Sequence, residues 1–170
     1  LSSGAALVKG RLAHRLFEML PALDSGVRES AARKIIKLQK DISKQDAELV
    51  FQEVMTVLAQ PKLSHLFAPD ALAEVPAIGV VADVGVAGQI DRLHVDNKSV
   101  LFADFKTGQR PSGSLPLAYQ RQMALYRALL QQIYTDHRIE GWIIWTEDAS
   151  TQEVTEKMCA DSLAEFGDFS

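Results

Sequence analysis

The sequence predicts one mixed α/β (α+β) domain in which a central mixed β-sheet is flanked by helices and the N-terminal third is helical. Three patterns predict this class. Apolar residues recur at helical spacing across residues 5–58, alternate at strand spacing across residues 71–108, and return to helical spacing over residues 115–134. A continuous apolar run at 139–146 then suits a buried strand. A chain of 170 residues has room for one such domain.

The helical part is expected to occupy residues 1–67. Its apolar stripes predict three helices and a short helical piece, at residues 5–20, 27–42, 47–58 and 62–67. Pro21, Gly26, the polar stretch 43–46 and Pro61 separate these helices, because proline and glycine end helices and short polar stretches connect them.

The sheet core is expected over residues 68–170. Alternating, valine-rich segments punctuated by glycine predict three strands, at residues 72–82, 86–95 and 100–107. The helix at 115–134 precedes the buried strand at 139–146, so a crossover should place that strand parallel to a neighbour. A short edge strand near Glu153 and a last helix to Phe166 complete the prediction.

Composition places the chain among soluble folded proteins, since 47% of its residues are apolar and 24% are charged. No apolar run approaches the length of a membrane span, and the first residues do not resemble a signal peptide. The single cysteine, Cys159, excludes an internal disulfide and an all-cysteine zinc or iron–sulfur site within this chain. We therefore expect a cytoplasmic protein without a membrane partner.

Charge is distributed unevenly along the chain. The total of −4 alone argues against a nucleic-acid partner. However, residues 1–45 carry +5 and residues 106–139 carry +4, whereas residues 46–105 carry −6 and residues 140–170 carry −7. The total therefore averages basic and acidic segments, and it does not exclude DNA.

The hairpin around Asn97 is the most informative feature. If Val95 faces Val100, then Asp91 faces Asp104. Two facing carboxylates repel each other, and a divalent cation such as Mg²⁺ between them would remove that cost. Lys106 shares a strand face with Asp104 and would orient a water molecule or offset phosphoryl charge. The alternative, a solvated surface pair, stays open because the register depends on the length of the turn.

Two further groups are candidates. His14 lies on the first helix, where the simplest alternative is a histidine at the edge of the core. Tyr119, Gln122 and Tyr126 form one stripe on the long helix. Two tyrosines at this spacing are usual in core packing, but a glutamine among them needs a hydrogen-bond partner.

Four segments in order resemble the motifs of the RecB-type branch of the PD-(D/E)xK nuclease superfamily. They are GRLAHRLFEML (10–20), GQIDRL (88–93), FADFKTG (102–108) and YQRQMALY (119–126). The series is similar to the carboxy-terminal nuclease domain of AddA and RecB subunits, which belong to helicase–nuclease machines that resect double-strand breaks. The resemblance implies a restriction-endonuclease-like sheet.

The resemblance also implies roles for individual residues. His14, Asp91 and Asp104 correspond to metal-binding side chains, Phe105 would lend its backbone carbonyl to the metal, and Asp91, Asp104 and Lys106 would be catalytic. The implied metal is Mg²⁺, with Mn²⁺ as an alternative that a histidine ligand suits. No iron–sulfur cluster is expected.

The long helix and the first strand would support this site. Tyr119, Gln122 and Tyr126 match the motif that supports the site and meets DNA, and Glu74 stands where relatives often carry a glutamate. The alternative for Glu74 is a charge on an edge strand. Further contacts to DNA phosphates are expected from four basic residues, Arg33, Lys34, Lys37 and Arg121. The alternative for the basic second helix is a solvated face.

The resemblance implies a Mg²⁺-dependent, exodeoxyribonuclease V-like enzyme in the bacterial cytoplasm that acts on DNA, single-stranded if a motor delivers it. The chain has no GxxxxGK[ST] loop, so ATP would act only through helicase domains upstream of this fragment. An AddB-like or RecC-like subunit would be the partner. The alternatives are a catalytically inactive scaffold for DNA or subunit binding, an RNase, and a mobile-element nuclease of the same superfamily.

Overall fold

The N-terminal helices form a layer of their own. In the computed structural model, which describes residues 3–167, this layer contains three α-helices and a short 3₁₀ helix: α1 (Ser3–Met19), α2 (Ser25–Lys37), α3 (Lys44–Leu58) and η1 (Pro61–Phe67). Helix α3 starts where the Ser43 hydroxyl accepts a hydrogen bond from the backbone N–H of Asp46 at 3.0 Å. Helix α2 ends five residues earlier than predicted, because Ile42 packs against the helical core from a loop.

The remaining elements form one five-stranded sheet with two further helices. They are β1 (Leu72–Val81), β2 (Val84–Val95), β3 (Ser99–Lys106), α4 (Leu117–Ile133), β4 (Arg138–Trp145), β5 (Ser150–Val154) and α5 (Glu156–Gly167). The strands lie in chain order. The pair β3 and β4 is parallel, as predicted for a strand that follows a crossover helix, and the other pairs are antiparallel. The predicted mixed sheet with flanking helices is therefore confirmed.

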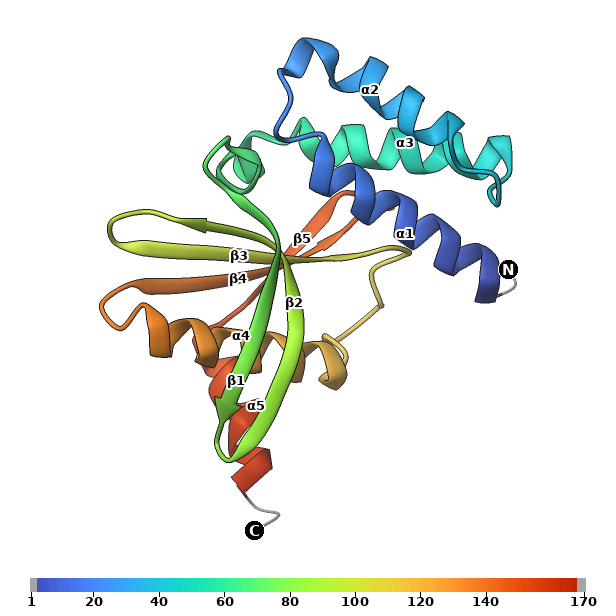
Figure 1. The fold of residues 1–170 in the computed structure, drawn as a ribbon. Coiled ribbons are helices and arrows are strands. Elements are labelled where there is room, and N and C mark those ends of the chain that lie inside the picture. Colours follow the sequence, from blue (N-terminus) through green and yellow to red (C-terminus); the bar gives the residue numbers. More distant parts are fainter. Residues whose placement is uncertain (1–2, 168–170) are drawn as a thin grey trace.

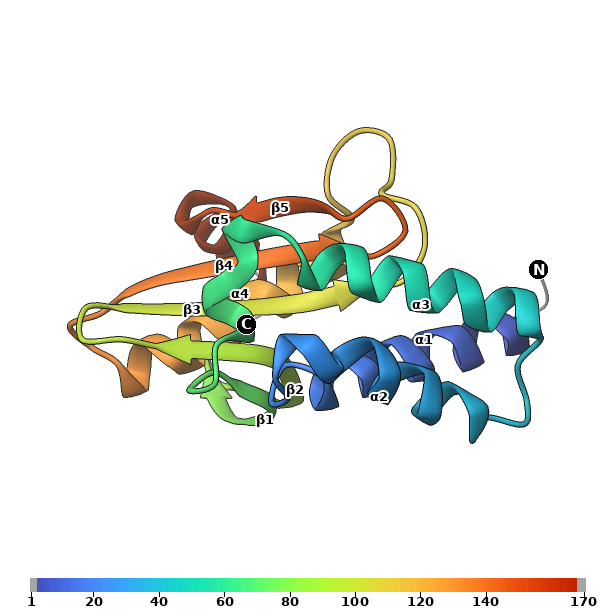
Figure 2. The ribbon, with the colours of Figure 1, turned by 90° about the horizontal axis from the view of Figure 1, so that it is seen from above.

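Helices cover both faces of the sheet (Figures 1 and 2). One face packs on α4, with Phe102 and Ile143 fully buried beneath the helix. The other face packs on α1, α3 and η1 through Phe105 and Ile144. Successive strand residues point to opposite faces, so β3 contributes to both cores. Helix α2 packs on α1 and α3 and lies furthest from the sheet.

The hairpin of β2 and β3 has the predicted register. Val95 pairs with Val100, and the pairing continues to Arg92 and Ala103. The ladder ends there, because β2 swings away from β3 together with β1 (Figure 1). A gap thus opens between the two strands at the level of the predicted carboxylates.

None of the helices in residues 3–167 is long and apolar enough to cross a membrane.

Candidate active site

Three side chains that can bind a metal meet at the gap between β2 and β3. They are His14 of α1, Glu74 of β1 and Asp91 of β2, and their ligand atoms all lie within 4.8 Å of one another. His14 Nδ1 lies 3.3 Å from Asp91 Oδ1. Asp91 is buried, whereas His14 and Glu74 are half-buried and face an open hollow beside α1. The cluster is therefore accessible from solvent on one side only.

A distortion of the β1–β2 pair creates this arrangement. Ile90 and Leu93 both pack in the core beneath α4, although residues three apart in a regular strand point to opposite faces. Opposite Asp91, Glu74 has φ of +52°, a left-handed conformation that costs a residue with a side chain about 1–3 kcal/mol. Glu74 also drops out of the ladder between Ala73 and Val75. Strain of this kind inside a strand, where no turn requires it, is often found at functional sites.

The close approach of α1 brings His14 to the sheet. A Cβ at Gly10, one turn before His14, would lie 3.3 Å from Thr107 Oγ1, so glycine leaves the room that this approach needs. The ring of Phe17, one turn further on, stacks on the ring of Phe105 with centroids 4.0 Å apart. Together these contacts hold the helix against the end of β3.

Asp91 also binds the neighbouring strand directly. Its Oδ2 accepts a hydrogen bond from the backbone N–H of Phe105 at 2.7 Å, which replaces the ladder bond lost where the strands separate. In an extended strand, the N–H and C=O of one residue point to the same side. The Phe105 carbonyl therefore points toward β2 and the cluster.

Asp104 and Lys106 lie next to this cluster and form an ion pair, with 2.7 Å between Asp104 Oδ2 and Lys106 Nζ. Asp104 is 5% exposed, so its charge has little access to water. Burial raises the pKa of the Asp104 carboxyl, and the negative charge of Asp91 raises it further. A cation near both carboxylates would relieve this unfavourable charge.

Helix α4 holds the ammonium of Lys106 in place. Lys106 Nζ donates to Gln122 Oε1 at 3.0 Å, and it lies 4.3 Å from the centre of the Tyr119 ring. Gln122 Nε2 donates to Asp104 Oδ1 at 3.3 Å. The stripe predicted on this helix thus faces the site, and its glutamine has the hydrogen-bond partners that a half-buried amide needs.

Tyr126 connects α4 to the β1–β2 hairpin. Its buried hydroxyl accepts a hydrogen bond from the backbone N–H of Gln89 at 3.1 Å and one from Gln122 Nε2 at 3.3 Å. A Cβ at Gly88 would lie 2.3 Å from this hydroxyl, so only glycine admits the contact. Gly88 and Tyr126 are therefore linked to Lys106 through Gln122.

The pKa values of Glu74 and His14 are shifted in this site, where several carboxylates lie close together. Burial raises the pKa of Glu74, and Asp91 adds to the rise. The hydrogen bond with Asp91 raises the pKa of His14, and burial opposes the rise. An imidazole and several carboxylates in one cluster form a donor set that suits Mg²⁺ or Mn²⁺. The residues present therefore fit a divalent metal.

Three of the four basic residues predicted to contact DNA, Arg33, Lys34 and Lys37, lie on α2, the helix furthest from the sheet. Arg33 is engaged within the helical layer: its guanidinium lies 3.1 Å from Glu48 and 4.1 Å from the centre of the Phe51 ring. Lys34 and Lys37 are exposed on the same outer helix, and Arg121 is half-buried on α4.

Two basic residues that the motif analysis did not assign, Arg11 and Arg15, line the hollow beside the cluster. Helical spacing supplied the signal. His14 stands three residues after Arg11, and Arg15 stands four residues after Arg11. These are the spacings that place side chains on one side of a helix, here α1.

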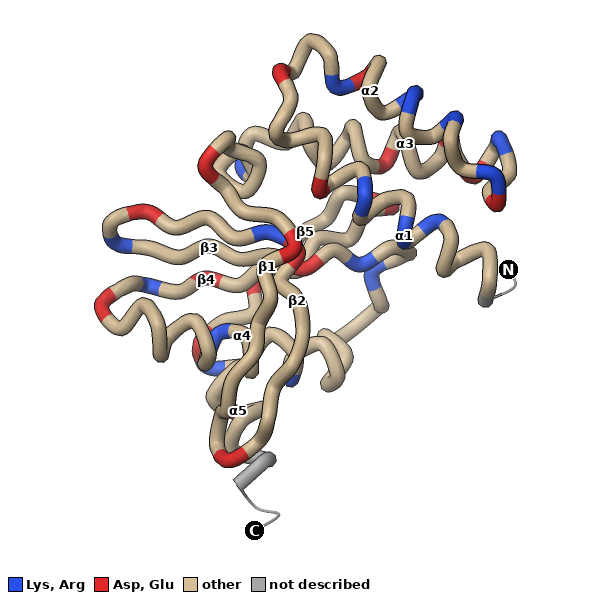
Figure 3. The backbone as a smooth tube through the Cα atoms, viewed as in Figure 1, with Lys and Arg blue, Asp and Glu red and all other residues tan. Residues whose placement is uncertain are grey.

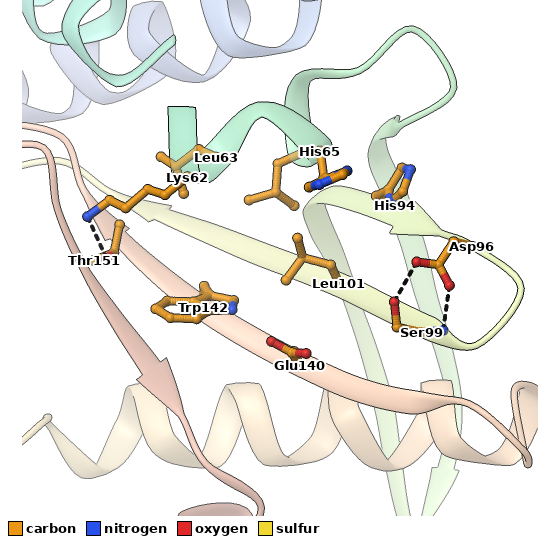
Figure 4. A pocket seen from close by; sticks show the side chains of 11 residues that line it. Lys62, Leu63, His65, His94, Asp96, Ser99, Leu101, Glu140, Trp142 and Thr151 are labelled. Atoms are coloured by element: carbon orange, nitrogen blue, oxygen red, sulfur yellow. Dashed lines mark hydrogen bonds between the residues drawn. The ribbon is translucent and has the colours of Figure 1, made fainter. Parts of the chain in front are cut away.

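A separate pocket of about 320 Å³ lies at the other end of the strands (Figure 4). Four of its polar side chains are bonded in pairs: Ser99 Oγ donates to Asp96 at 2.7 Å, and Lys62 Nζ to Thr151 at 3.1 Å. Trp142 and Leu101 form part of its lining. No group of three possible metal ligands occurs there among the described residues. This pocket is therefore not a candidate for the same chemistry.

Comparisons with known proteins give one informative result. A sequence model described as the PD-(D/E)XK nuclease superfamily matches residues 2–167. No curated protein is similar enough in sequence to count as a match. Among solved structures, the crystal structure of SSO0001 covers 89% of this chain and 72% of its own, with 16% sequence identity and a TM-score of 0.39. A structural likeness of that size supports no conclusion about fold or activity.

Proposed function

Because the chain belongs to the PD-(D/E)XK nuclease superfamily, we propose that it is a metal-dependent deoxyribonuclease that hydrolyses phosphodiester bonds at the cluster beside β3. One observation carries the proposal. The ligand atoms of His14, Glu74 and Asp91 lie close enough together to hold a metal ion, and the next strand presents a buried Asp104 paired with Lys106. A cation site next to a positioned ammonium is the combination that phosphodiester hydrolysis needs.

The chain offers enough ligands for one divalent cation. His14 and the carboxylates of Asp91 and Asp104 would hold it, with the Phe105 carbonyl as a backbone ligand and Glu74 at the open side. Bound Mg²⁺ or Mn²⁺ would polarise the scissile phosphate and lower the pKa of the attacking water. The phosphate would approach from the open side of the cluster, because Asp91 and Asp104 close the other side.

Lys106 and α4 would supply the remaining chemistry. Lys106 pairs with Asp104 beside the cluster, so its ammonium would orient the attacking water and offset the charge that builds on the phosphate. Gln122 and Tyr119 would act as positioning residues, since their contacts hold the ammonium in one place. Tyr126 would position Gln122 in turn.

At a finer level, we propose the nuclease module of an AddAB-type or RecBCD-type helicase–nuclease that resects double-strand breaks in the bacterial cytoplasm. The four ordered motifs support this assignment. ATP would be used by helicase domains elsewhere in the same protein, an AddB-like or RecC-like subunit would complete the enzyme, and the substrate would be single-stranded DNA. The broad active-site hollow suits a flexible strand more than it suits a groove that reads bases.

A cleavage assay tests the proposal. The wild type should cleave labelled DNA in Mg²⁺ or Mn²⁺ and should be inactive in EDTA, whereas Asp104→Asn should be inactive in all three. Asp83→Asn is a matched control, because it makes the same carboxylate-to-amide change in the exposed β1–β2 turn, where asparagine tolerates the positive φ. Cleavage by Asp104→Asn at the wild-type rate would refute the proposed site.

Further measurements on the same proteins distinguish between the alternative functions. Calorimetry with Mn²⁺ should show binding to the wild type and much weaker binding to Asp91→Asn, whereas an inactive scaffold would bind no metal at the cluster. Parallel assays on single-stranded DNA, duplex DNA and RNA distinguish a resecting nuclease from an RNase. Sequencing the residues that precede Leu1 in the full gene distinguishes a helicase–nuclease from a mobile-element nuclease.

A further inference from the structure

Helix α1 carries a second group of functional side chains next to His14. An open hollow of about 590 Å³ lies between this helix and Glu74, and α1 lines it with Arg11, Arg15 and Glu18 as well as His14. The opposite side of the helix is buried in the helical core through Ala13 and Leu16. The hollow therefore joins the proposed metal cluster directly to two arginines.

Arg11 and Arg15 are available to bind a ligand. Both side chains are exposed, and neither makes a hydrogen bond or an ion pair with any residue of the described chain. Glu18 and Glu74 line the same hollow, yet no ion pair forms with them. By contrast, Arg33 is held by carboxylates on α2 and α3. The two arginines are thus not occupied in stabilising the fold.

Their chemistry and position match a phosphate backbone. A guanidinium presents a planar fork of N–H donors that binds phosphate through paired hydrogen bonds. Figure 3 shows basic residues spaced along α1 and acidic residues gathered where β1 begins. A nucleic-acid strand with one phosphate at the metal cluster has its neighbouring phosphates close by, and the arginines line the hollow through which that strand must pass.

We infer that Arg11 and Arg15 form a phosphate clamp that holds the DNA strand beside the scissile bond; this inference rests on the proposed nuclease function. The clamp binds the sugar–phosphate backbone and reads no base, because contacts to phosphate carry no sequence information. It places the DNA path along α1, between the cluster and the solvent. The other role open to the two arginines is to offset the carboxylate charge of the cluster.

The test uses the double variant Arg11→Ala/Arg15→Ala of the whole chain. A fluorescently labelled oligothymidylate is bound in Ca²⁺, which prevents cleavage, over a series of salt concentrations. Loss of two phosphate contacts should reduce the slope of log K against log [salt] by about 1.4, from about 0.7 per contact on single strands. The Arg11→Lys/Arg15→Lys variant should recover most of the slope, since each lysine keeps its charge.

The matched control is Lys98→Ala/Lys157→Ala, which removes two exposed positive charges elsewhere, from the β2–β3 turn and from α5. It should keep the wild-type slope. A fall in slope as large in this control as in the arginine variant would overturn the clamp, because only net charge would then matter. An unchanged slope in the arginine variant, with higher Mn²⁺ affinity, would overturn it in favour of charge offset at the cluster.

Cleavage measured in parallel separates this inference from the function on which it rests. With both correct, the arginine variant should show a higher KM at a nearly unchanged kcat. If the wild type cleaves DNA and the variant keeps both KM and the salt slope, the clamp alone is wrong. If the wild type fails to cleave DNA with any metal, the proposed function is wrong, and the salt slopes still decide whether Arg11 and Arg15 bind the strand.

Discussion

Replacing Gly88 by alanine should damage both stability and catalysis, although residue 88 touches no proposed metal ligand. The new Cβ would lie 2.3 Å from Tyr126 Oη and 2.9 Å from its Cε1. Tyr126 must therefore move, and the hydrogen bond from the Gln89 N–H is lost. Overpacking lowers the free energy of unfolding by about 1–3 kcal/mol, and the lost hydrogen bond lowers it by about 1 kcal/mol. Replacing a glycine in a strand raises it by about 0.5–1 kcal/mol.

The net expectation is a loss of about 2 kcal/mol in the free energy of unfolding, which lowers Tm by about 4–8 °C in a domain of this size. Catalysis should fall as well, because a displaced Tyr126 releases Gln122 and with it Lys106. A displacement of about 1 Å at a positioning group typically costs on the order of 10²-fold in kcat.

Urea unfolding and steady-state cleavage measure both effects. Gly88→Ala in a Tyr126→Phe background tests the cause. The hydroxyl, which is the closest of the clashing atoms, is then gone, so the double variant should lose at least about 0.5 kcal/mol less than the sum of the two single-variant losses. Wild-type stability and wild-type kcat in Gly88→Ala would refute the coupling. Strictly additive costs would refute the clash as its source.

Four other outcomes follow from the same contacts. Phe17→Ala should lower the free energy of unfolding by about 3–5 kcal/mol, because it removes a fully buried ring stacked on Phe105; a loss below 1 kcal/mol in urea unfolding would contradict the packing. Lys106→Ala should lower kcat on the order of 10²–10³-fold while DNA binding in Ca²⁺ stays near wild type, and equal losses in kcat and affinity would instead indicate a binding role. Mn²⁺ at 100 times its Kd should stabilise the wild type by about 2.7 kcal/mol in thermal unfolding, and Asp91→Asn should abolish the shift; an equal shift in that variant would place the metal elsewhere. Hydrogen bonds from the backbone of Lys98 and from Ser99 lower the pKa of Asp96 to about 2. A lowered folded-state pKa stabilises the fold above the unfolded value of about 4 and loses that effect as the pH falls through about 2, so Asp96→Ala should be less stable than wild type at pH 7 and similar to it near pH 2.

The elements of the fold could be predicted because their signals are local. Helical periodicity predicted α1, α3 and α4, and alternation on both sides of one turn predicted the β2–β3 hairpin, which has the Val95–Val100 pairing that was assumed for it. Each of these signals depends on neighbouring residues in one segment. The stripe of Tyr119, Gln122 and Tyr126 was predictable for the same reason.

The distortion at Asp91 could not be predicted. It depends on the left-handed backbone of Glu74 and on the separation of β2 from β3, and both arise from packing between distant segments. Regular alternation places Asp91 directly opposite Asp104. In the structure, the Asp91 carboxylate instead accepts a hydrogen bond from the Phe105 N–H and contacts the ring of His14. Helical spacing could place Arg11 and Arg15 near His14, but it could not show that they are unpaired, because an arginine on a helix surface looks the same in sequence whether it is paired or free.

Cleavage of DNA by the wild type and by Asp91→Asn, with and without Mn²⁺, tests the central claim most directly. Asp91 lies between His14 and the Phe105 backbone, and it is one of the three proposed metal ligands that lie close together. The account predicts Mn²⁺-dependent cleavage by the wild type and none by Asp91→Asn, with the variant still folded by circular dichroism. Cleavage that persists in the folded variant, or that proceeds in the wild type without a divalent metal, would contradict it.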